Sequence, residues 1–181
     1  MLPTDEESDL LSALDLAVKQ KTLCNDTEGA IGLYESAFRR HPALIQKRGT
    51  DKLGLLIQHD TKLSKPFAEY LIRNDFSKDH LQKTMIGLVI ANDEINFAKM
   101  EGRSTDRDLI VFAYDILTEQ HLLFDEKTSP NFDMLVSASL ARLLVDMGRT
   151  DDALPYLDMA RQRALELDDT RMIIMLDEFQ V

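Results

Sequence analysis

Cysteine, glycine and proline are scarce in this chain, and each scarcity excludes a class of protein. The 181 residues include one cysteine, seven glycines and five prolines. The single cysteine, Cys24, cannot form a disulfide within the chain, which is typical of a reducing compartment. So few glycines and prolines argue against an all-β or linker-rich protein. No stretch approaches the run of about 20 apolar residues that a membrane-spanning helix needs. The opening segment, Met1 to Asp9, is too acidic for a signal peptide, so we expect a cytoplasmic protein that binds no membrane.

Sequence motifs that carry enzyme chemistry are also missing. The residues three positions before the four histidines are Phe38, Leu56, Ser77 and Thr118, so the Glu-x-x-His pattern of di-iron bundles does not occur. Zinc sites need clustered cysteine and histidine, which the chain does not offer. It contains no phosphate loop, dinucleotide fingerprint or nucleophile elbow. We therefore predict no metal, no cofactor and no enzyme activity, and interpret Cys24 as a small apolar filler.

Positive charge is the minority charge. The chain has 21 lysines and arginines against 32 aspartates and glutamates, a net charge of −11. This balance disfavours nucleic acid and anionic lipid and is more compatible with a basic or apolar protein partner. A basic stretch nevertheless contains Arg39, Arg40, Lys47, Arg48 and Lys52. This patch is a candidate site for an acidic partner or a phosphate group; the alternative is a solvated surface that neutralises nearby carboxylates.

What the chain does have is apolar residues at helical spacing almost throughout, with no comparable length of strand-like alternation. We predict an all-α protein of about eight or nine helices, forming a single domain over residues 1–181. Short connections imply that successive helices are antiparallel neighbours. The predicted hairpins cover approximately 5–41, 43–74, 77–125 and 130–167, followed by a capping helix over 169–180.

Residues with known positional preferences mark helix ends. Ser64 to Pro66 is predicted to start one helix, and Ser129-Pro130 another. Thr150 is predicted to cap the helix that follows it. Two turns read alike, Gly102-Arg103-Ser104-Thr105-Asp106 and Gly148-Arg149-Thr150-Asp151, and each stands between two predicted helices.

Three of the predicted helices carry apolar stripes that we expect to face the interior. The stripe residues are Leu81, Met85, Leu88, Val89, Ile95 and Phe97 in the first helix, Leu109, Phe112, Ala113, Ile116, Leu117 and Leu123 in the second, and Phe132, Leu135, Val136, Leu140, Leu143, Leu144 and Met147 in the third. Asn92 falls on the same side as the first stripe. Because a buried amide needs partners, Asn92 either hydrogen-bonds a neighbouring helix or faces an open groove.

Residues 134–167 show an ordered set of large and small side chains. A large residue stands beside a small one in the first helix, glycine occupies the turn, and the second helix reads small, large, small. The residues are Leu140, Ala141, Leu144, Gly148, Ala153, Leu157 and Ala160. Small side chains let two helices approach closely while large ones fill the space beside them. This unit resembles a tetratricopeptide repeat (TPR).

The segment 10–42 resembles the same repeat more weakly. Four residues fit the second-helix pattern and its end, namely Ala30, Tyr34, Ala37 and Pro42. Lys21 stands where the family has a large apolar residue, and residues 43–128 lack the small-large-small signature. The resemblance implies a short α-solenoid of stacked antiparallel hairpins.

In TPR proteins the exposed side of each first helix lines a concave groove that binds peptides or helices. The resemblance therefore implies partner-binding roles for Asp15, Lys19, Arg142 and Asp146, to which we add Asn92. One TPR subtype clamps a C-terminal carboxylate with lysine and asparagine. Asp15 stands where that clamp has a cation, so we do not expect recognition of that kind.

These observations favour a protein–protein interaction module, an adaptor, chaperone or regulator that binds a peptide or helical segment. The alternative is a sensor of small molecules or peptides, with a pocket around Phe67, Tyr70, Phe97 and Phe112. An enzyme or a nucleic-acid regulator is less compatible with the sequence, and both a monomer and a homo-oligomer stay open.

Overall fold

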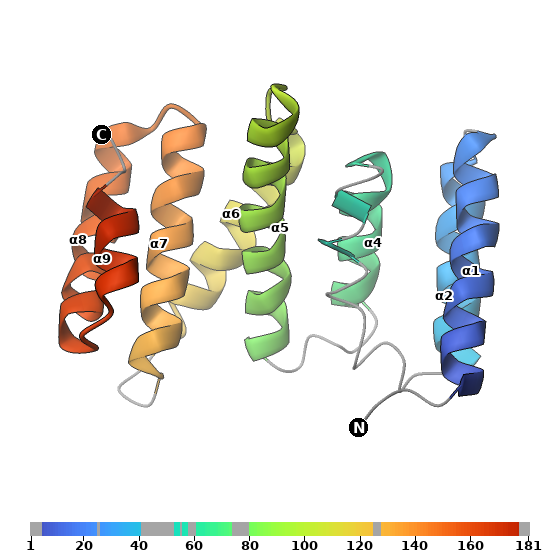
Figure 1. Cartoon of the computed structure of the whole chain (residues 1–181), viewed down its shortest axis with the longest axis horizontal. Helices are drawn as coiled ribbons and strands as arrows, with labels where there is room; N and C mark the ends of the chain where they lie inside the picture. The colour runs from blue at the N-terminus through green and yellow to red at the C-terminus, as the bar shows by residue number, and fades with distance from the viewer. Residues whose placement is uncertain are drawn as a thin grey trace. The chain divides into compact units, whose positions relative to one another are not determined.

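The chain divides into two compact units, each described here by itself: unit 1, Met1–Phe76, and unit 2, Ser77–Val181. In a computed structural model (Figure 1), the described residues are 5–24, 26–40, 53–54, 56–57, 61–73, 80–124 and 128–177. All regular secondary structure in these ranges is helical, which confirms the all-α class. None of the helices found there has an apolar stretch of the length that crossing a bilayer requires. One continuous array of repeats stays a prediction.

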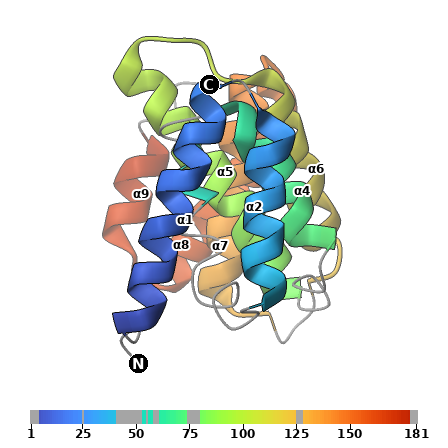
Figure 2. The same cartoon turned by 90° about the vertical axis from the view of Figure 1, so that its right-hand side faces the viewer.

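Unit 1 contains α1 (Asp5–Leu23), α2 (Thr27–Arg40) and α4 (Thr61–Arg73). Helices α1 and α2 lie side by side (Figure 2). Asp26 separates them, and its Oδ1 accepts a hydrogen bond from the backbone N–H of Gly29 at 2.9 Å. One of the free N–H groups at the start of α2 is thereby satisfied, so Asp26 caps this helix. Lys21 holds the same carboxylate by an ion pair of 2.7 Å.

Helix α4 begins earlier than its sequence predicts. It starts at Thr61, and Ser64 and Pro66 lie inside it rather than at its first turn. Proline removes one backbone hydrogen bond from a helix interior. Burial of Phe67 and Leu71 on the same helix offsets that loss, because both side chains are almost fully enclosed. The rings of Phe67 and Tyr34 of α2 lie 4.8 Å apart between centroids, which joins α4 to α2.

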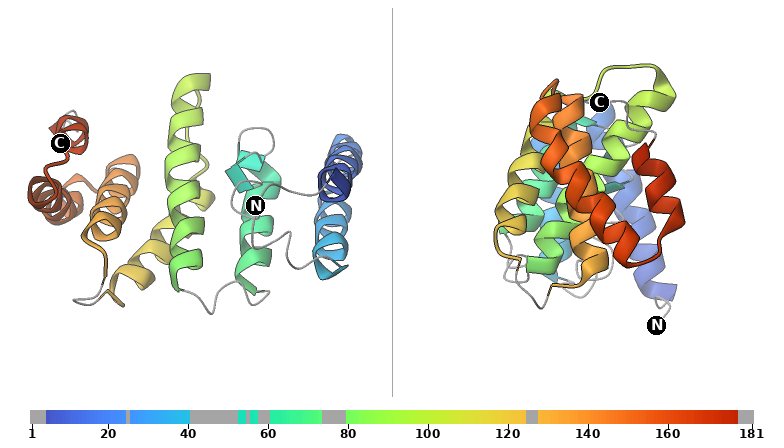
Figure 3. Two further views of the ribbon diagram at one scale, coloured as in Figure 1. Left: turned by 60° about the horizontal axis from the view of Figure 1, so that its bottom comes forward. Right: turned by 90° about the vertical axis from the view of Figure 1, so that its left-hand side faces the viewer.

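Unit 2 contains α5 (His80–Glu101), α6 (Arg107–His121), α7 (Pro130–Asp146), α8 (Thr150–Glu166) and α9 (Thr170–Asp177). Helix α5 packs against α6 and α7, α6 against α7, α7 against α8, and α8 against α9 (Figures 1 and 3). The turns after α5 and α7 are short, so each of these helices runs antiparallel to its successor.

Three turns of unit 2 end the preceding helix in the same way. The residues at Gly102, Gly148 and Asp168 have φ of 65°, 73° and 55°. The next residue donates its N–H to a carbonyl five positions back, as in Arg103 N to Ala98 O at 3.0 Å and Arg149 N to Leu144 O at 2.8 Å. This bonding satisfies carbonyls at the helix end, and the left-handed backbone favours glycine. Both predicted glycine turns are confirmed.

Two helix starts can be compared with their predictions. Helix α7 begins at Pro130 with Ser129 as its N-cap, as predicted. The prediction for Thr150 is wrong by one position, because Arg149 is the N-cap of α8 and Thr150 is its first helical residue. The Schellman-type bonding of the preceding turn uses the Arg149 N–H, which places the cap at Arg149.

The small residues of α7 and α8 lie where these helices meet. Ala141, Ala153 and Ala160 are all fully buried, in one cluster with Leu144 and Leu157. The expected close approach of this pair is therefore confirmed. The α5–α6 pair is also close, at a position the sequence analysis did not single out: a methyl group added at Gly87 would lie 2.8 Å from the Leu117 side chain.

The predicted inner stripes are partly wrong. Leu81, Met85, Leu123 and Leu135 are 52%, 39%, 53% and 43% exposed. Helix α5 instead buries a rotated set of residues, which are Thr84, Ile86, Gly87, Leu88, Ile90, Ala91, Glu94 and Ala98. Apolar residues occur on several sides of α5, so periodicity alone did not fix which side faces α6 and α7. Leu123 lies beyond the end of α6 at His121.

Candidate functional site

Three of the predicted partner-binding residues lie on α5 and α7, two helices that pack against each other. Asn92 belongs to α5, and Arg142 and Asp146 belong to α7. The Nη2 of Arg142 donates to Oδ1 of Asn96 at 2.6 Å. Because Asn96 stands one helical turn after Asn92, both amides share one side of α5. The structure thus brings Arg142 to the side of α5 that carries Asn92.

The hydrogen bond of the Asn92 side chain goes to its own helix rather than to a neighbouring one. Its Nδ2 donates to the carbonyl of Leu88, one turn earlier in α5, at 3.0 Å. A short polar side chain can reach a carbonyl of its own helix, so the amide needs no donor or acceptor from a neighbouring helix. Asn92 is half-buried.

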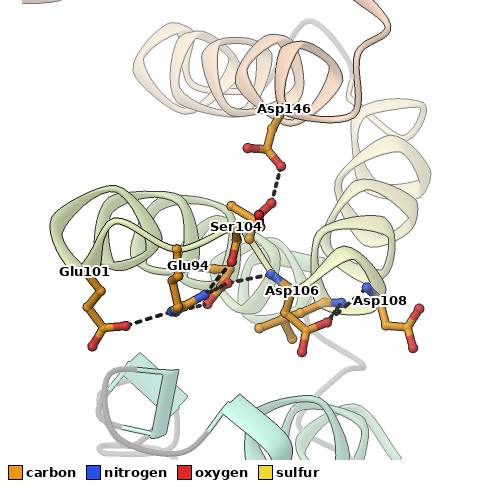
Figure 4. A network of polar contacts seen from close by, with 9 residues as sticks. Glu94, Glu101, Ser104, Asp106, Asp108 and Asp146 are labelled. Atoms are coloured by element: carbon orange, nitrogen blue, oxygen red, sulfur yellow. Dashed lines mark hydrogen bonds and ion pairs between the residues drawn. The ribbon is translucent and has the colours of Figure 1, made fainter.

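Arg142 and Asp146 both make hydrogen bonds within unit 2. Burial lowers the pKa of Arg142, and the nearby Asp146 carboxylate acts in the opposite direction. The Oδ2 of Asp146 accepts from the Thr105 hydroxyl at 2.6 Å, which ties α7 to the α5–α6 turn (Figure 4). Asp146 therefore has a structural role that the sequence did not indicate.

The remaining predicted residues belong to unit 1. Lys19 is exposed on α1, and Asp15 is half-buried one turn before it. Burial raises the pKa of Tyr34, and the Asp15 carboxylate adds to that rise, so these two side chains interact. Of the basic patch, Arg39 and Arg40 are exposed at the end of α2. The other members, Lys47, Arg48 and Lys52, lie outside the described residues.

A buried carboxylate organises the turn between α5 and α6. The side chain of Glu94 is fully buried and accepts from Arg103 Nη1 at 2.6 Å and Nη2 at 3.1 Å. It also accepts from the backbone N–H of Asp106 at 2.7 Å (Figure 4). Glu101 bonds Arg103 Nε at 2.7 Å, and these carboxylates, Glu94 first, raise the pKa of Arg103. Glu94 stands at helical spacing between Ala91 and Ala98, and that position is the signal that could have indicated its burial.

An open cavity of about 490 Å³ lies where the start of α5, the end of α6 and the start of α7 meet. Its walls are mainly apolar, from Leu81, Leu123, Phe124, Phe132 and Leu135. Three of these residues, Leu81, Leu123 and Leu135, are stripe residues expected in the interior, and they are about half exposed. A volume of this size is within the range of about 300–1,000 Å³ that is usual for ligand sites.

One wall of the cavity is polar. Gln120 lines it and is only 1% exposed, and its Oε1 lies 3.1 Å from Nδ1 of His80. The Nε2 of Gln120 is buried and has no hydrogen-bond partner among the residues that the structure describes. Buried polar atoms without a partner are rare in folded proteins and each needs an explanation.

The junction beside the cavity is held by contacts between three helices. Asp133 of α7 accepts from Nε of Arg163 on α8 at 2.8 Å, and Nε2 of His121 lies 3.5 Å from the same carboxylate. The ring of Phe124 lies 5.2 Å from that of His121 and 5.8 Å from that of Phe132. These ring contacts hold Phe124 and Phe132 together at the cavity wall.

The four aromatic residues predicted to surround a sensor pocket do not line this cavity. Phe67 and Tyr70 are buried in unit 1, where their rings lie 6.2 Å apart. Phe97 and Phe112 belong to unit 2, and neither lines the cavity. The aromatic residues that do line it, Phe124 and Phe132, are close to helix ends, where a stripe pattern gives a weak signal.

Comparison of the chain with protein-family models, with curated proteins and with solved structures gave no match.

Proposed function

We propose that unit 2 is a protein-binding module, of the adaptor, chaperone or regulator kind, that takes an apolar side chain of a partner segment into the cavity between α5, α6 and α7. The observation that carries the proposal is the gathering of Leu81, Leu123 and Leu135, from three parts of the chain, around one cavity while each is about half exposed. Exposed apolar groups gathered on one surface are typical of binding sites.

The polar side chains of α5 and α7 suit the rim of such an interface. Asn92 and Asn96 on α5 and Arg142 on α7 lie farther along these two helices than the helix starts that line the cavity. Interfaces commonly have an apolar centre and a polar rim, and a helix-in-groove mode uses anchors spaced along one face. The TPR resemblance supports the same surface, because the first helices of TPR hairpins line the binding groove. We propose in addition that the protein works in the cytoplasm.

Panning a random-peptide phage library against the immobilised full chain tests the proposal. We expect enrichment of peptides with a large apolar residue, and loss of their binding to a Leu135→Arg variant. Leu154→Arg is the matched control, because Leu154 on α8 is 46% exposed against 43% for Leu135 and does not line the cavity. Enriched peptides that bind the Leu135→Arg variant as well as the parent would contradict the proposal, as would a library that yields no specific peptide.

The second candidate function, sensing of a small molecule, is favoured by the volume of the same cavity. A thermal-shift screen with metabolites separates the two candidates. A metabolite that raises the melting temperature of the parent but not of the Leu135→Arg variant, with no peptide enriched by panning, would favour the sensor.

A further inference from the structure

The unpartnered nitrogen of Gln120 distinguishes this cavity from a purely apolar one. A buried amide nitrogen without its hydrogen bond is unfavourable, because it has lost its hydration and gained no partner in return. Gln120 belongs to α6, one turn after the buried Ile116 and Leu117, so a leucine or methionine there would fill the same wall at no such cost. A group that supplies the missing partner would remove the penalty on binding.

The chemistry of the wall limits what that group can be. Of the described residues that line the cavity, none is an aspartate, glutamate, lysine or arginine. A charged group buried there would lose its hydration without gaining a counter-charge from these described residues. A hydrocarbon alone would leave the Gln120 amide as it is. The Nε2 of Gln120 is a donor, so the missing partner is a hydrogen-bond acceptor. A neutral acceptor next to a large apolar body satisfies the apolar walls and this donor together.

A peptide group beside a large apolar side chain has this chemistry. We infer that the cavity binds a partner segment through one leucine- or phenylalanine-sized side chain and that the Gln120 amide hydrogen-bonds the adjoining main-chain peptide group. The inference rests on the proposed function and adds to it a named recognition residue and the chemical class of its target. The main-chain carbonyl of a peptide accepts from an amide N–H, so the pairing adds specificity for polypeptide over a plain hydrocarbon.

The amide can reach such a group by a small movement. The Nε2 of Gln120 is covered in the structure, and Oε1 faces Nδ1 of His80. The last side-chain torsion of glutamine is soft, so the amide turns at low energy. His80 is exposed at the start of α5 and can follow that rotation.

The probe for the test is N-acetyl-phenylalanine methylamide, which carries the aromatic ring and two peptide groups, and toluene is the matched apolar probe. Titration of each into isotopically labelled full-length protein is followed by nuclear magnetic resonance. We expect the capped amino acid to shift both the methyl signals of Leu81 and Leu135 and the side-chain amide signals of Gln120. Toluene shifts the same methyl signals, and because it has no hydrogen-bond acceptor of comparable strength it should move the Gln120 amide signals less than the capped amino acid does.

Gln120→Met removes the amide and keeps the length of the side chain. We expect the dissociation constant of the capped amino acid to rise by about 2- to 12-fold, the range of one hydrogen bond, while that of toluene stays constant or falls. Gln162→Met is the control, because Gln162 is exposed on α8 and does not line the cavity, and it should change neither dissociation constant. Equal effects of Gln120→Met on both probes would overturn the inference, and so would a capped amino acid that leaves the Gln120 amide signals of the parent unshifted.

These outcomes are separate from the fate of the proposed function. Peptides enriched by panning that need Leu135 but tolerate Gln120→Met leave the proposed function standing and overturn the inference. If Gln120→Met does not fold, the amide shifts of the parent protein with the two probes decide the question alone.

Discussion

The turn between α5 and α6 and the turn between α7 and α8 share the order glycine, arginine, then a short polar residue, but their arginines lie in different surroundings. Arg103 turns inward to the fully buried Glu94, at 2.6 Å. Arg149 turns outward, where it pairs with the exposed Asp152 at 2.7 Å and lies over the Tyr114 ring, 5.3 Å from its centroid. Both glycines have positive φ and both helices end with the same backbone bonds.

A single position in the preceding helix accounts for the difference. Eight residues before Gly102 stands Glu94, and eight residues before Gly148 stands Leu140, which is fully buried. A buried carboxylate requires a cation and hydrogen-bond donors, and Arg103 and the Asp106 N–H supply them. A buried leucine makes no such demand, so Arg149 stays in the solvent. Similar turn sequences therefore adopt the same backbone conformation, while the buried residue of the preceding helix determines whether the arginine side chain points inward or outward.

The largest expected effect comes from removing the two arginines one at a time. Arg103→Met leaves Glu94 as a buried carboxylate without its cation, and we expect a loss of about 3–5 kcal/mol in the free energy of unfolding. Arg149→Met breaks a solvent-screened pair and a cation–π contact, for which we expect a much smaller loss than that of Arg103→Met. Urea denaturation followed by circular dichroism, with hydrogen exchange of the α5 and α8 amides, measures both.

Glu94→Leu combined with Arg103→Met is the control for this interpretation. It places a leucine eight residues before Gly102, as Leu140 stands eight residues before Gly148. Replacing both members of a buried pair by apolar residues is often close to neutral, so the double variant should recover most of the loss. A double variant as unstable as Arg103→Met alone would show that the pair does not explain the difference between the turns.

The intermediate effect concerns the feature that the turns share. Alanine at Gly102 or Gly148 meets no atom within 4 Å, so only the left-handed backbone opposes it. We expect Gly102→Ala and Gly148→Ala each to lower the melting temperature by a similar amount, corresponding to about 1–2 kcal/mol. Asp168 has a φ of 55° at the third such turn, so we expect Asp168→Gly to raise the melting temperature. Unequal losses at the two glycines would mean that the turns do not share one backbone requirement.

The smallest effect concerns the helix starts that follow the turns. Asp106 accepts from the backbone N–H groups of Asp108 and Leu109, at 3.0 and 3.2 Å, so we expect Asp106→Ala to cost about 1 kcal/mol. Thr150 is the first helical residue rather than the cap, and Thr150→Ala should stay within about 0.5 kcal/mol. Thermal unfolding measures the difference, and equal losses would restore a capping role to Thr150.

Local signals in the sequence predicted local structure well. The all-α class, the glycine turns at 102 and 148 and the start of α7 at Pro130 depend on neighbouring residues, and the structure confirms them. The burial of Ala141, Ala153 and Ala160 also followed from helical spacing. The predicted binding residues were placed less completely: Arg142 and Asn92 share a helix pair, but Asn92 bonds its own helix and Asp146 bonds Thr105.

The cavity was missed because its walls come from residues that an amphipathic pattern assigns to the interior. Leu81, Leu123 and Leu135 have the spacing of core residues, and spacing does not report where one helix ends beside another. Gln120 on α6 gave no signal at all, since a polar residue at a helix end is usually solvated.

The order of apolar and polar residues determined by itself that this chain forms helices and where several of them stop, because helix formation and termination depend on residues within a few positions of one another. Tertiary structure alone decided which sides of α5 are buried and why Arg103 turns inward while Arg149 does not. It also decided that three leucines and the Gln120 side chain, whose Nε2 has no partner among the described residues, line the same cavity. Those outcomes depend on contacts between residues far apart in the chain, and their energies are set by desolvation in the assembled core.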